Sequence, residues 1–339
     1  MASTPGPTLT LKAAIYTRYG PPGVLELKVV EKPRPGARDL LIRIDATVVE
    51  ATDAIFRSGD NFAARLATGA FRPKHNILGF ELAGAIEAVG SEVTRFKPGD
   101  RVFGSTSPVS GTYAQFICVP EDSALATMPS NTTCDEAVAV CDGGLTALPF
   151  LRDEAHIHHG QQVLINGASG SVGTAAVQLA KYFGAEVTGV CSARNLKLVK
   201  SLGADLVIDY RQQDFARAGQ TYDIIFDTVG KRSFTQCRPA LKQSGIYLST
   251  VLTPTILWQT LWTSRIGSKR AKIAFAGLRS TGDRTEDLVL LRELIETGRI
   301  KPVIDKRYTL DQIAEAHAYV DTGHKAGGVV ITMSHDNDS

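Results

Sequence analysis

A cluster of small residues follows a short apolar run near the middle of the chain, in a pattern that suits phosphate binding. Residues 163–173 read Val-Leu-Ile-Asn-Gly-Ala-Ser-Gly-Ser-Val-Gly, and a helix-compatible segment continues to Phe183 before Gly184. This order predicts a strand, a tight turn and a helix that ends at a glycine. The start of that helix would offer free N–H groups and a partial positive charge to the phosphates of a dinucleotide.

The glycine spacing is close to the dinucleotide fingerprint, but its first position is alanine. Ala168-x-Gly170-x-x-Gly173 stands in place of G-x-G-x-x-G, so the motif taken alone is a weak signal. Gly170 would let the backbone approach a pyrophosphate, and Gly173 would let the helix pack close to the strand. The expected cofactor contacts are Ala168, Ser169, Gly170, Ser171, Val172 and Gly173. A glycine-rich turn that binds nothing is the alternative.

The end of the next expected strand distinguishes two nicotinamide cofactors. An Asp or Glu about twenty residues after the glycines would bind the ribose 2′-OH of NAD. This chain has Ser192 there, followed by Arg194 and Lys197. A missing carboxylate with a hydroxyl donor and two nearby cations suits a 2′-phosphate. The sequence therefore predicts NADP(H), and the alternative is a solvated basic helix start.

Metal binding finds little support in the sequence. His156, His158 and His159 precede the glycine turn without Cys or carboxylates at ligand spacing. The five cysteines are scattered and form no C-x-x-C pair, which argues against a disulfide framework and suits a reducing compartment. We expect no metal site.

Length and composition are those of a globular protein. The 339 residues suffice for two domains of ordinary size, and charged residues make up 21%. A formal net charge of +2 argues against a nucleic-acid partner. Because the sequence has neither a signal-peptide core nor about 18 consecutive apolar residues, we expect a soluble, cytoplasmic protein.

The elements that must position these residues fall into two types. Up to residue 130, closely spaced strand patterns and Gly-Pro turns suggest a barrel-like β fold. From residue 131 to 280, strands and helices alternate, as in βαβ units with a parallel sheet. The β module is expected to resume over residues 281–339 and is therefore discontinuous.

The expected strands of the first module are 11–16, 25–30, 39–49, 80–89, 101–103 and 111–119. Short helices at 134–140 and 144–151 lead to a helix at 195–202 and to strands at 163–166, 186–191, 206–208, 222–227, 245–250 and 272–276. Helices at 286–297 and 310–320 and strands at 301–304 and 328–333 follow. The tail, residues 334–339, is expected to be disordered.

One basic and aromatic segment admits two interpretations. Thr255–Lys272 carries Trp258, Trp262 and several Lys and Arg residues. Apolar residues at helical spacing indicate a packed or subunit-contact face, whereas a basic amphipathic stretch could lie on an anionic membrane. A peripheral membrane contact through this segment stays open.

Several local stretches resemble the medium-chain dehydrogenase/reductases, and among them the zinc-free, zeta-crystallin-like quinone oxidoreductases. Besides the glycine turn, they are Lys97–Phe103, Gly111–Phe116, Gly144–Ala147, Gln178–Lys181, Ser201–Asp205, Phe226–Gly230 and Lys325–Thr332. The resemblance is collinear over nearly the whole chain. It implies a GroES-like catalytic domain split around a doubly wound Rossmann domain, an active site in the cleft between them, and a homodimer.

The resemblance also implies a site without zinc. Glu50 stands where zinc-dependent relatives have a Cys, and Gly79-Phe-Glu81 stands where they have Gly-His-Glu. The four-cysteine lobe expected between Val102 and Gly111 is missing. Without zinc, no Lewis acid polarises an alcohol or carbonyl oxygen. Quinones and α,β-unsaturated carbonyls then remain as hydride acceptors, because their reduction gives an enolate that needs only hydrogen-bond donors and a proton.

The resemblance assigns catalytic candidates to one segment. Thr52 matches a Ser or Thr that relays a proton in zinc relatives. The quinone branch often has Asn at the position of Glu50, so this chain departs from the branch there. Glu50 could donate a proton if burial raised its pKa, and a structural role is the alternative. Asp53 is the third candidate. The long segment Asp53–Phe71, with Phe56, Phe62 and Phe71, is expected to border the substrate.

Further cofactor contacts are implied in the same way. Thr146 matches a residue that lies against the nicotinamide, and Tyr210 matches one that can reach the 2′-phosphate. Val229 and Gly230 end another matching stretch.

The prediction is a zinc-independent, NADPH-dependent oxidoreductase of quinones, enones and enals. Two enzyme alternatives are an enoyl-thioester reductase, which would need a channel for an acyl carrier, and an NADP(H)-dependent alcohol or carbonyl oxidoreductase. A third alternative is an NADPH-binding protein without turnover that associates with a membrane or RNA.

Overall fold

The computed structural model describes residues 9–335 except 61–64 and 67. It divides the chain into two compact units. Unit 1 comprises the chain up to Cys141 together with Ser280–Arg292 and the residues from Ile304 onward. Unit 2 comprises Asp142–Arg279 and Glu293–Val303. The sequence had placed the boundaries at residues 130 and 280.

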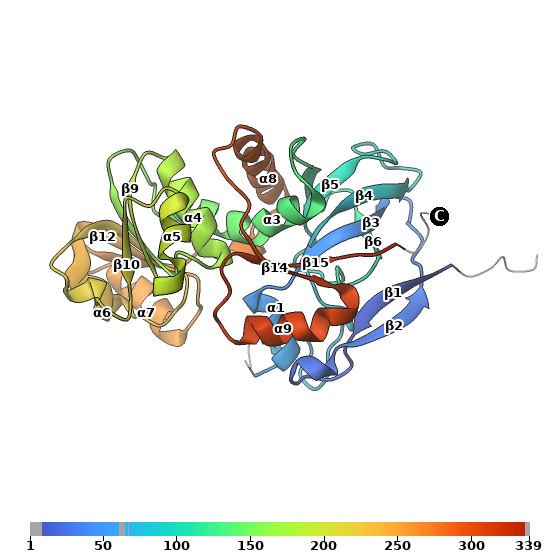
Figure 1. The fold of residues 1–339 in the computed structure, drawn as a ribbon, viewed down its shortest axis with the longest axis horizontal. Helices are drawn as coiled ribbons and strands as arrows, with labels where there is room; N and C mark the ends of the chain where they lie inside the picture. Colours follow the sequence, from blue (N-terminus) through green and yellow to red (C-terminus); the bar gives the residue numbers. More distant parts are fainter. Residues whose placement is uncertain (1–8, 61–64, 67, 336–339) are drawn as a thin grey trace, which may run out of the picture. The chain divides into compact units, whose positions relative to one another are not determined.

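Unit 1 contains a seven-stranded sheet in the order β14-β15-β3-β4-β5-β7, with β6 also paired to β3 (Figure 1). Its strands are β3 (Asp39–Val48), β4 (Glu81–Val89), β5 (Arg101–Ser105), β6 (Phe116–Pro120), β7 (Ala124–Thr127), β14 (Ile304–Thr309) and β15 (Gly328–Thr332). β1 (Thr10–Ile15) and β2 (Glu26–Glu31) form a separate antiparallel pair. Because β15 pairs antiparallel with β3, the two ends of the chain complete one sheet.

The core of unit 1 follows the period-two pattern of its central strand. Leu40, Ile42 and Ile44 on β3 are fully buried and lie on one face of the strand, because alternate residues point the same way. The helices of this unit include α1 (Ala51–Ser58) and α9 (Ile313–Asp321), which contact each other. A segment near the start of the chain and one near its end therefore meet there.

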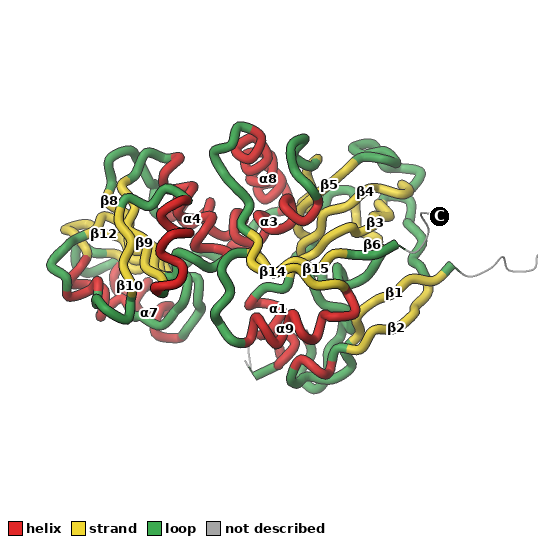
Figure 2. The backbone as a smooth tube through the Cα atoms, in the orientation of Figure 1, coloured by secondary structure: helices red, strands yellow, loops and turns green. Residues whose placement is uncertain are grey.

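Unit 2 is a six-stranded parallel sheet in the order β10-β9-β8-β11-β12-β13 (Figure 2). Its strands are β8 (Gln162–Asn166), β9 (Glu186–Cys191), β10 (Leu206–Asp209), β11 (Tyr222–Asp227), β12 (Leu241–Ser249) and β13 (Arg270–Lys272). Its helices include α4 (Ser171–Tyr182), α5 (Leu196–Ser201), α6 (Phe234–Cys237) and α7 (Pro254–Thr263). The order reverses between β8 and β11, which is the switch point where a doubly wound sheet binds ligands.

Two long helices contribute residues to both units, α3 (Cys134–Pro149) and α8 (Thr281–Glu296). α3 replaces the two short helices expected at 134–140 and 144–151, and a π-helical turn, Phe150–Glu154, continues it. Gly143 lies inside α3 and permits a close approach, since an added Cβ would lie 2.5 Å from the Ser171 carbonyl oxygen.

Other expected elements are displaced. The strand expected at 301–304 begins only at Ile304, as β14. The strand expected at 272–276 is the shorter β13, followed by a 3₁₀ turn, Ala276–Leu278. The strand expected from residue 111 starts at Phe116. Residues 51–58 form the helix α1, where the sequence analysis expects no helix.

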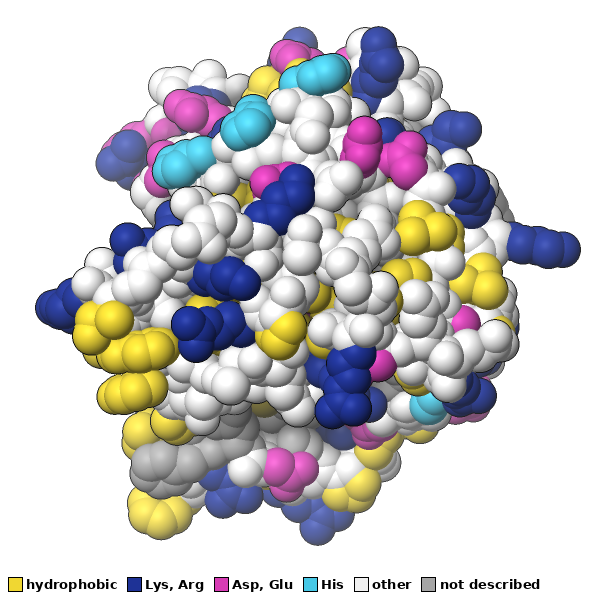
Figure 3. Space-filling model, turned by 90° about the vertical axis from the view of Figure 1, so that its left-hand side faces the viewer, with side chains coloured by type: hydrophobic (Ala, Val, Ile, Leu, Met, Phe, Trp, Pro, Cys, Tyr) yellow, Lys and Arg dark blue, Asp and Glu magenta, His cyan; other side chains and the backbone are white. Residues whose placement is uncertain are grey.

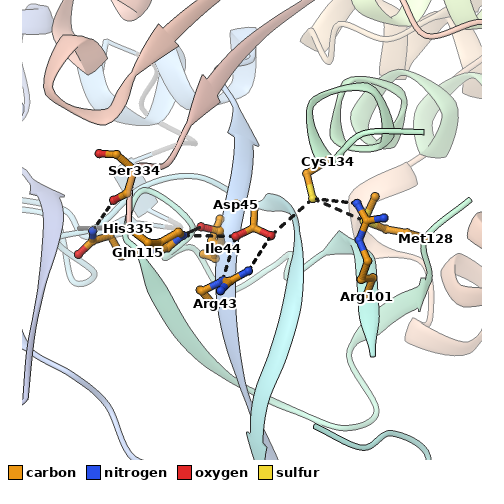
Figure 4. A network of polar contacts seen from close by, with 9 residues as sticks. All are labelled: Arg43, Ile44, Asp45, Arg101, Gln115, Met128, Cys134, Ser334 and His335. Carbon is orange, nitrogen blue, oxygen red and sulfur yellow. Dashed lines mark hydrogen bonds and ion pairs between the residues drawn. The ribbon is translucent and has the colours of Figure 1, made fainter. Parts of the chain in front are cut away.

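The expectation of a disordered tail is wrong for its first two residues (Figure 4). Gln115 Nε2 donates to the Ser334 carbonyl oxygen at 2.7 Å. His335 Nε2 lies 2.9 Å from the Ile44 carbonyl oxygen and 3.3 Å from Asp45 Oδ1. These contacts hold the chain beyond β15 against β3. Residues 336–339 lie outside the described part of the chain.

The two fingerprint glycines serve different purposes, which a pair of substitutions separates. An added Cβ at Gly173 would lie 2.1 Å from the Gly167 carbonyl oxygen, whereas at Gly170 the nearest atom would be 3.6 Å away. We expect Gly173→Ala to lower the free energy of unfolding by about 2–3 kcal/mol and Gly170→Ala to change it by less than about 1 kcal/mol. Urea denaturation measures both, and equal effects would contradict the close approach of α4.

Candidate functional site

Unit 2 places the glycine turn at the carboxyl end of β8. The N–H groups of Gly167 and Ala168 both donate to the Val190 carbonyl oxygen at 3.0 Å, which joins the turn to β9. Gly167 has φ +85°, and an added Cβ there would lie 2.4 Å from Val229 Cγ2. Gly167, one residue before the expected position, is therefore the glycine that makes the tight turn.

The alanine in the fingerprint has a packing reason. Ala168 is fully buried, and an added Cβ on Gly189 of β9 would lie 3.1 Å from the Ala168 Cβ. Its methyl group thus fills space beside β9. Ala168 can offer a ligand only its backbone.

The start of α4 has the features that a pyrophosphate needs. The Ser171 hydroxyl is buried, and it has no hydrogen-bond partner among the described residues. The first N–H groups of a helix lack intrahelical acceptors and carry a partial positive charge. Because an added Cβ at Gly170 would meet only the Gly167 carbonyl oxygen, at 3.6 Å, a phosphate group could approach this backbone, and the residues present fit a dinucleotide. Val172 continues the same helical turn.

Ser169 and Thr146 lie beside this turn in different ways. The Ser169 hydroxyl accepts a hydrogen bond from Asn195 Nδ2 at 2.9 Å, which ties the turn to the segment after β9. Thr146 is half-buried on α3. It lies three residues after Gly143, on the same helical face, and Gly143 is the residue that approaches Ser171.

The residues expected to hold a 2′-phosphate gather at the ends of β9 and β10. Ser192 is half-buried, and Arg194 and Lys197 are exposed just beyond it. The Tyr210 N–H donates to the Cys191 carbonyl oxygen at 3.2 Å, so Tyr210 and Ser192 follow paired strands. A hydroxyl, two cations and a phenol thus share one rim of the sheet.

A buried carboxylate that the sequence analysis missed organises the loop opposite the glycine turn. Asp227, at the end of β11, accepts N–H groups from Val229 at 3.0 Å and Gly230 at 3.1 Å. It also accepts from Asn166 Nδ2 at 2.9 Å and from the Tyr247 hydroxyl at 3.0 Å. Val229 is 41% exposed. The sequence did contain a signal for this role of Asp227, since an Asp that ends an apolar strand can accept hydrogen bonds from the N–H groups of the loop after it.

The three catalytic candidates of unit 1 lie at the start of α1 in very different environments. Glu50 caps the helix, and its N–H donates to Asp53 Oδ2 at 2.8 Å, in a reciprocal capping box. The Glu50 carboxylate is buried and forms an ion pair with Lys325. Thr52 is exposed, whereas Asp53 is fully buried. The sequence analysis missed Lys325 as a partner.

Burial dominates the electrostatics of Asp53. It raises the pKa of this carboxyl to about 7, although the Glu50 N–H and the Lys325 charge act in the opposite direction. Asp53 Oδ1 and the Tyr113 hydroxyl are both buried, and the Tyr113 hydroxyl also acts to lower the pKa of Asp53. Burial, and then the charge of Asp53, raise the pKa of Tyr113 well above its usual value.

Arg57 and His317 continue this buried polar cluster. Arg57 lies 3.1 Å from His317 Nδ1 and donates to Asp321 at 2.8 Å. Because a guanidinium only donates, Nδ1 must accept and Nε2 must carry the proton. Burial, together with the Arg57 charge, lowers the pKa of His317 to about 3, so the ring is neutral. The cluster thereby ties α1 to α9.

The aromatic residues of the 53–71 segment do not share one role. The rings of Phe56 and Phe80 are 5.6 Å apart and pack against the core of unit 1. Phe71 is 97% exposed. Phe62 lies outside the described residues.

The described residues contain no group of three or more His, Cys, Asp or Glu that could hold a metal ion. Glu50 is paired with a lysine, and Glu81 accepts from the Ser105 hydroxyl at 3.3 Å. Of the helices that the structure describes, none is long and apolar enough to cross a bilayer.

The segment Thr255–Lys272 forms α7 and β13 and uses its cations internally. Lys269 donates to the carbonyl oxygens of Arg238 and Leu241, and Arg270 donates to that of Thr263. Trp258 and Trp262 stack with their centroids 5.8 Å apart. The face of the molecule in Figure 3 shows hydrophobic side chains gathered along one edge, with Lys and Arg spread among Asp and Glu elsewhere. Membrane contact stays a prediction.

The raised pKa of Asp53 predicts how the stability of the fold depends on pH. Its carboxyl binds a proton more tightly in the folded chain than at the ordinary value of 3.8, so the free energy of unfolding falls as pH rises from 4 to 7, by up to about 4 kcal/mol. Asp53→Asn keeps an acceptor for the Glu50 N–H and removes this dependence. Urea midpoints from pH 4 to 8 measure it, with exposed Asp60→Asn as the control. Parallel curves for wild type and Asp53→Asn would refute the assignment.

Two family models match the chain. The alcohol dehydrogenase GroES-like domain matches residues 36–130, and the zinc-binding dehydrogenase matches residues 202–331. These matches, together with the parallel sheet of unit 2, confirm the expected fold class. The name of the second model refers to zinc, but the described residues hold no candidate metal group.

Similar proteins extend over nearly the full chain. A quinone oxidoreductase of Pseudomonas aeruginosa is 32% identical over 329 residues, which are 93% of this chain and 98% of that protein. A 2-methylene-furan-3-one reductase of Solanum lycopersicum is 31% identical over 95% of this chain and 79% of that protein. The solved quinone oxidoreductase of Coxiella burnetii superposes with a TM-score of 0.86 at 28% identity, over 96% of this chain and 100% of that one. The chain is thus an oxidoreductase that belongs to the medium-chain dehydrogenase/reductase superfamily, in its zinc-free quinone oxidoreductase branch.

Proposed function

We propose that this chain is a cytoplasmic, homodimeric, NADPH-dependent reductase of quinones and α,β-unsaturated carbonyl compounds. The observation that carries the cofactor choice is the rim formed by Ser192, Arg194, Lys197 and Tyr210 beside the glycine turn. Two cations and two hydroxyls can neutralise and hydrogen-bond a 2′-phosphate. A carboxylate in the place of Ser192 would instead repel it.

The acceptor class follows from the similar proteins and from the chemistry of a site without a metal. The relatives include quinone oxidoreductases, and a 2-methylene-furan-3-one carries a C=C bond conjugated to a ketone. Bound NADPH would supply the hydride. An acceptor of this kind places the resulting negative charge on its own oxygen, so the protein needs to contribute only hydrogen-bond donors and a proton.

The catalytic candidates differ in burial and in bonding partners, so we assign them different roles. Glu50 accepts from Lys325 and caps α1, so its carboxylate positions the start of the helix. Asp53 is sealed in the buried polar cluster. Thr52 is the exposed member of the three, and its hydroxyl can both donate and accept a hydrogen bond. We assign the proton-relay role to Thr52 and a positioning role to Glu50 and Asp53.

The proposed activity has a direct test. Purified protein should oxidise NADPH, followed by absorbance, in the presence of 1,2-naphthoquinone, an enone or an enal, and should use NADH at least about tenfold less efficiently, as expected for one lost charge-assisted contact. Tight NADPH binding without turnover across the panel would instead favour the non-catalytic alternative. Equal use of both cofactors would contradict the NADP assignment.

The cations at the rim provide a second test. We expect Arg194→Ala and Lys197→Ala each to raise the KM for NADPH about tenfold, because a charge-assisted hydrogen bond is lost, and to leave the KM for NADH nearly unchanged. Lys200→Ala is the matched control, since Lys200 lies on α5 with Lys197 but donates to the Asp205 carbonyl oxygen at 2.7 Å. Equal changes with NADPH and NADH would remove the 2′-phosphate assignment.

A further inference from the structure

Unit 2 has a pocket at the far end of its sheet from Ser192 and Arg194. It is a pocket of about 300 Å³ between the π-helical turn after α3 and the segment after β13. Its lining includes Pro149, Asp153, Glu154, Phe275, Leu278 and Arg279. We propose that this pocket, here called the β13 pocket, receives the apolar substituent of the acceptor substrate. The proposal rests on the function proposed above.

The order of the strands sets the direction of the cofactor. The candidate 2′-phosphate groups follow β9 and β10, and the candidate pyrophosphate site follows β8. All strands are parallel, so their carboxyl ends share one edge. A dinucleotide laid along that edge must place its nicotinamide beyond β8, over β11 and β12. The nicotinamide of a bound cofactor would therefore lie on the β13 side of β8.

The β13 pocket lies on that same edge. Its apolar rim comes directly after Lys272, the last residue of β13, and three strand spacings separate β13 from β8, about 14 Å in all. The other wall is near the same edge too, because Phe150, which begins the π-helical turn, stacks on Phe226 near the end of β11 at 5.0 Å. Half of an extended dinucleotide can bridge this distance.

The charges around the pocket are paired, so it favours a neutral ligand. Asp153 contacts Arg152 at 2.6 Å and Arg279 at 3.5 Å. Glu154 contacts Lys272 at 3.6 Å. These ion pairs also fasten the segment after β13 to the π-helical turn. Because both carboxylates already have cationic partners, they offer no free charge to a charged ligand. An uncharged carbonyl compound does not need one.

The rim itself is unusually apolar for an exposed surface. Phe275 is 50% exposed and Leu278 is 77% exposed. Large apolar side chains at the mouth of a pocket that also carries a few polar groups are typical of a small-molecule site. The substrate class that fits is a quinone or enone with a hydrocarbon substituent, whose chain would cover Phe275 and Leu278.

A series of 2-alkyl-1,4-benzoquinones tests this assignment. We expect the wild-type kcat/KM to rise from the methyl to the pentyl compound. Phe275→Ser and Leu278→Ser should each lower kcat/KM at least fivefold for the pentyl compound and less than twofold for the methyl compound, with the KM for NADPH unchanged. Leu206→Ser is the matched control, because Leu206 is also exposed but begins β10, at the opposite edge of the sheet.

A binding measurement separates this proposal from the proposed function. Calorimetric titration of the NADP⁺-loaded protein with pentylhydroquinone should show the same fivefold loss of affinity in both serine variants. Turnover with unchanged chain-length dependence in the variants would overturn the pocket assignment and leave the reductase function standing. Binding that depends on Phe275 and Leu278 without any turnover would support the pocket and refute the function. Neither binding nor turnover would refute both.

Discussion

The candidate cofactor site depends on one steric constraint, the approach of α4 to the turn that precedes it. At Gly173 the helix comes so close to the Gly167 carbonyl oxygen that a single methyl group would overlap it. This approach brings the unpaired N–H groups of the helix to the switch point of the sheet. Gly189 and Ala168 fit together on the β9 side for the same reason. The space left beside Gly170 is then available to a ligand.

In unit 1, a buried polar cluster surrounds the start of α1. The buried polar cluster joins Glu50, Asp53 and Arg57 of α1 to His317 of α9 and to Lys325. Removing one partner from such a set leaves an uncompensated buried charge, which costs about 3–5 kcal/mol. The cluster therefore fixes where α1 begins. It also fixes where the exposed hydroxyl of Thr52 lies.

Much of this arrangement could be predicted from the sequence. Periodicity and turn residues located the αβ block, since buried parallel strands such as β11 are short and continuously apolar. The glycine spacing and the residues after β9 gave the candidate cofactor contacts. Contacts between residues far apart in the chain could not be predicted from the sequence. Nothing local in Lys325 indicates that it meets Glu50, 275 residues away, and nothing near residue 53 shows that its carboxyl is sealed in the interior.

The predictions from the sequence were wrong where contacts with distant residues override local preference. The sequence predicts two short helices, 134–140 and 144–151, yet α3 continues through residues 141–143. Gly143 within it lies close to the Ser171 carbonyl oxygen. The polar tail was read as disordered, yet Ser334 and His335 find partners on Gln115 and β3. In both cases the deciding partner lies far away in the sequence.

The pairing of β15 with β3 has a consequence for synthesis of the chain on the ribosome. β3 is made before unit 2, but one of its neighbours, β15, consists of residues 328–332 and is made after unit 2. The six strands of unit 2 are complete once Lys272 has been made. Domains generally fold as units during translation, so the parallel sheet can assemble while the flank of β3 still waits for its partner. An apolar, hydrogen-bonding edge of this kind is a template for unwanted pairing, and the nascent chain carries it until β15 has been made.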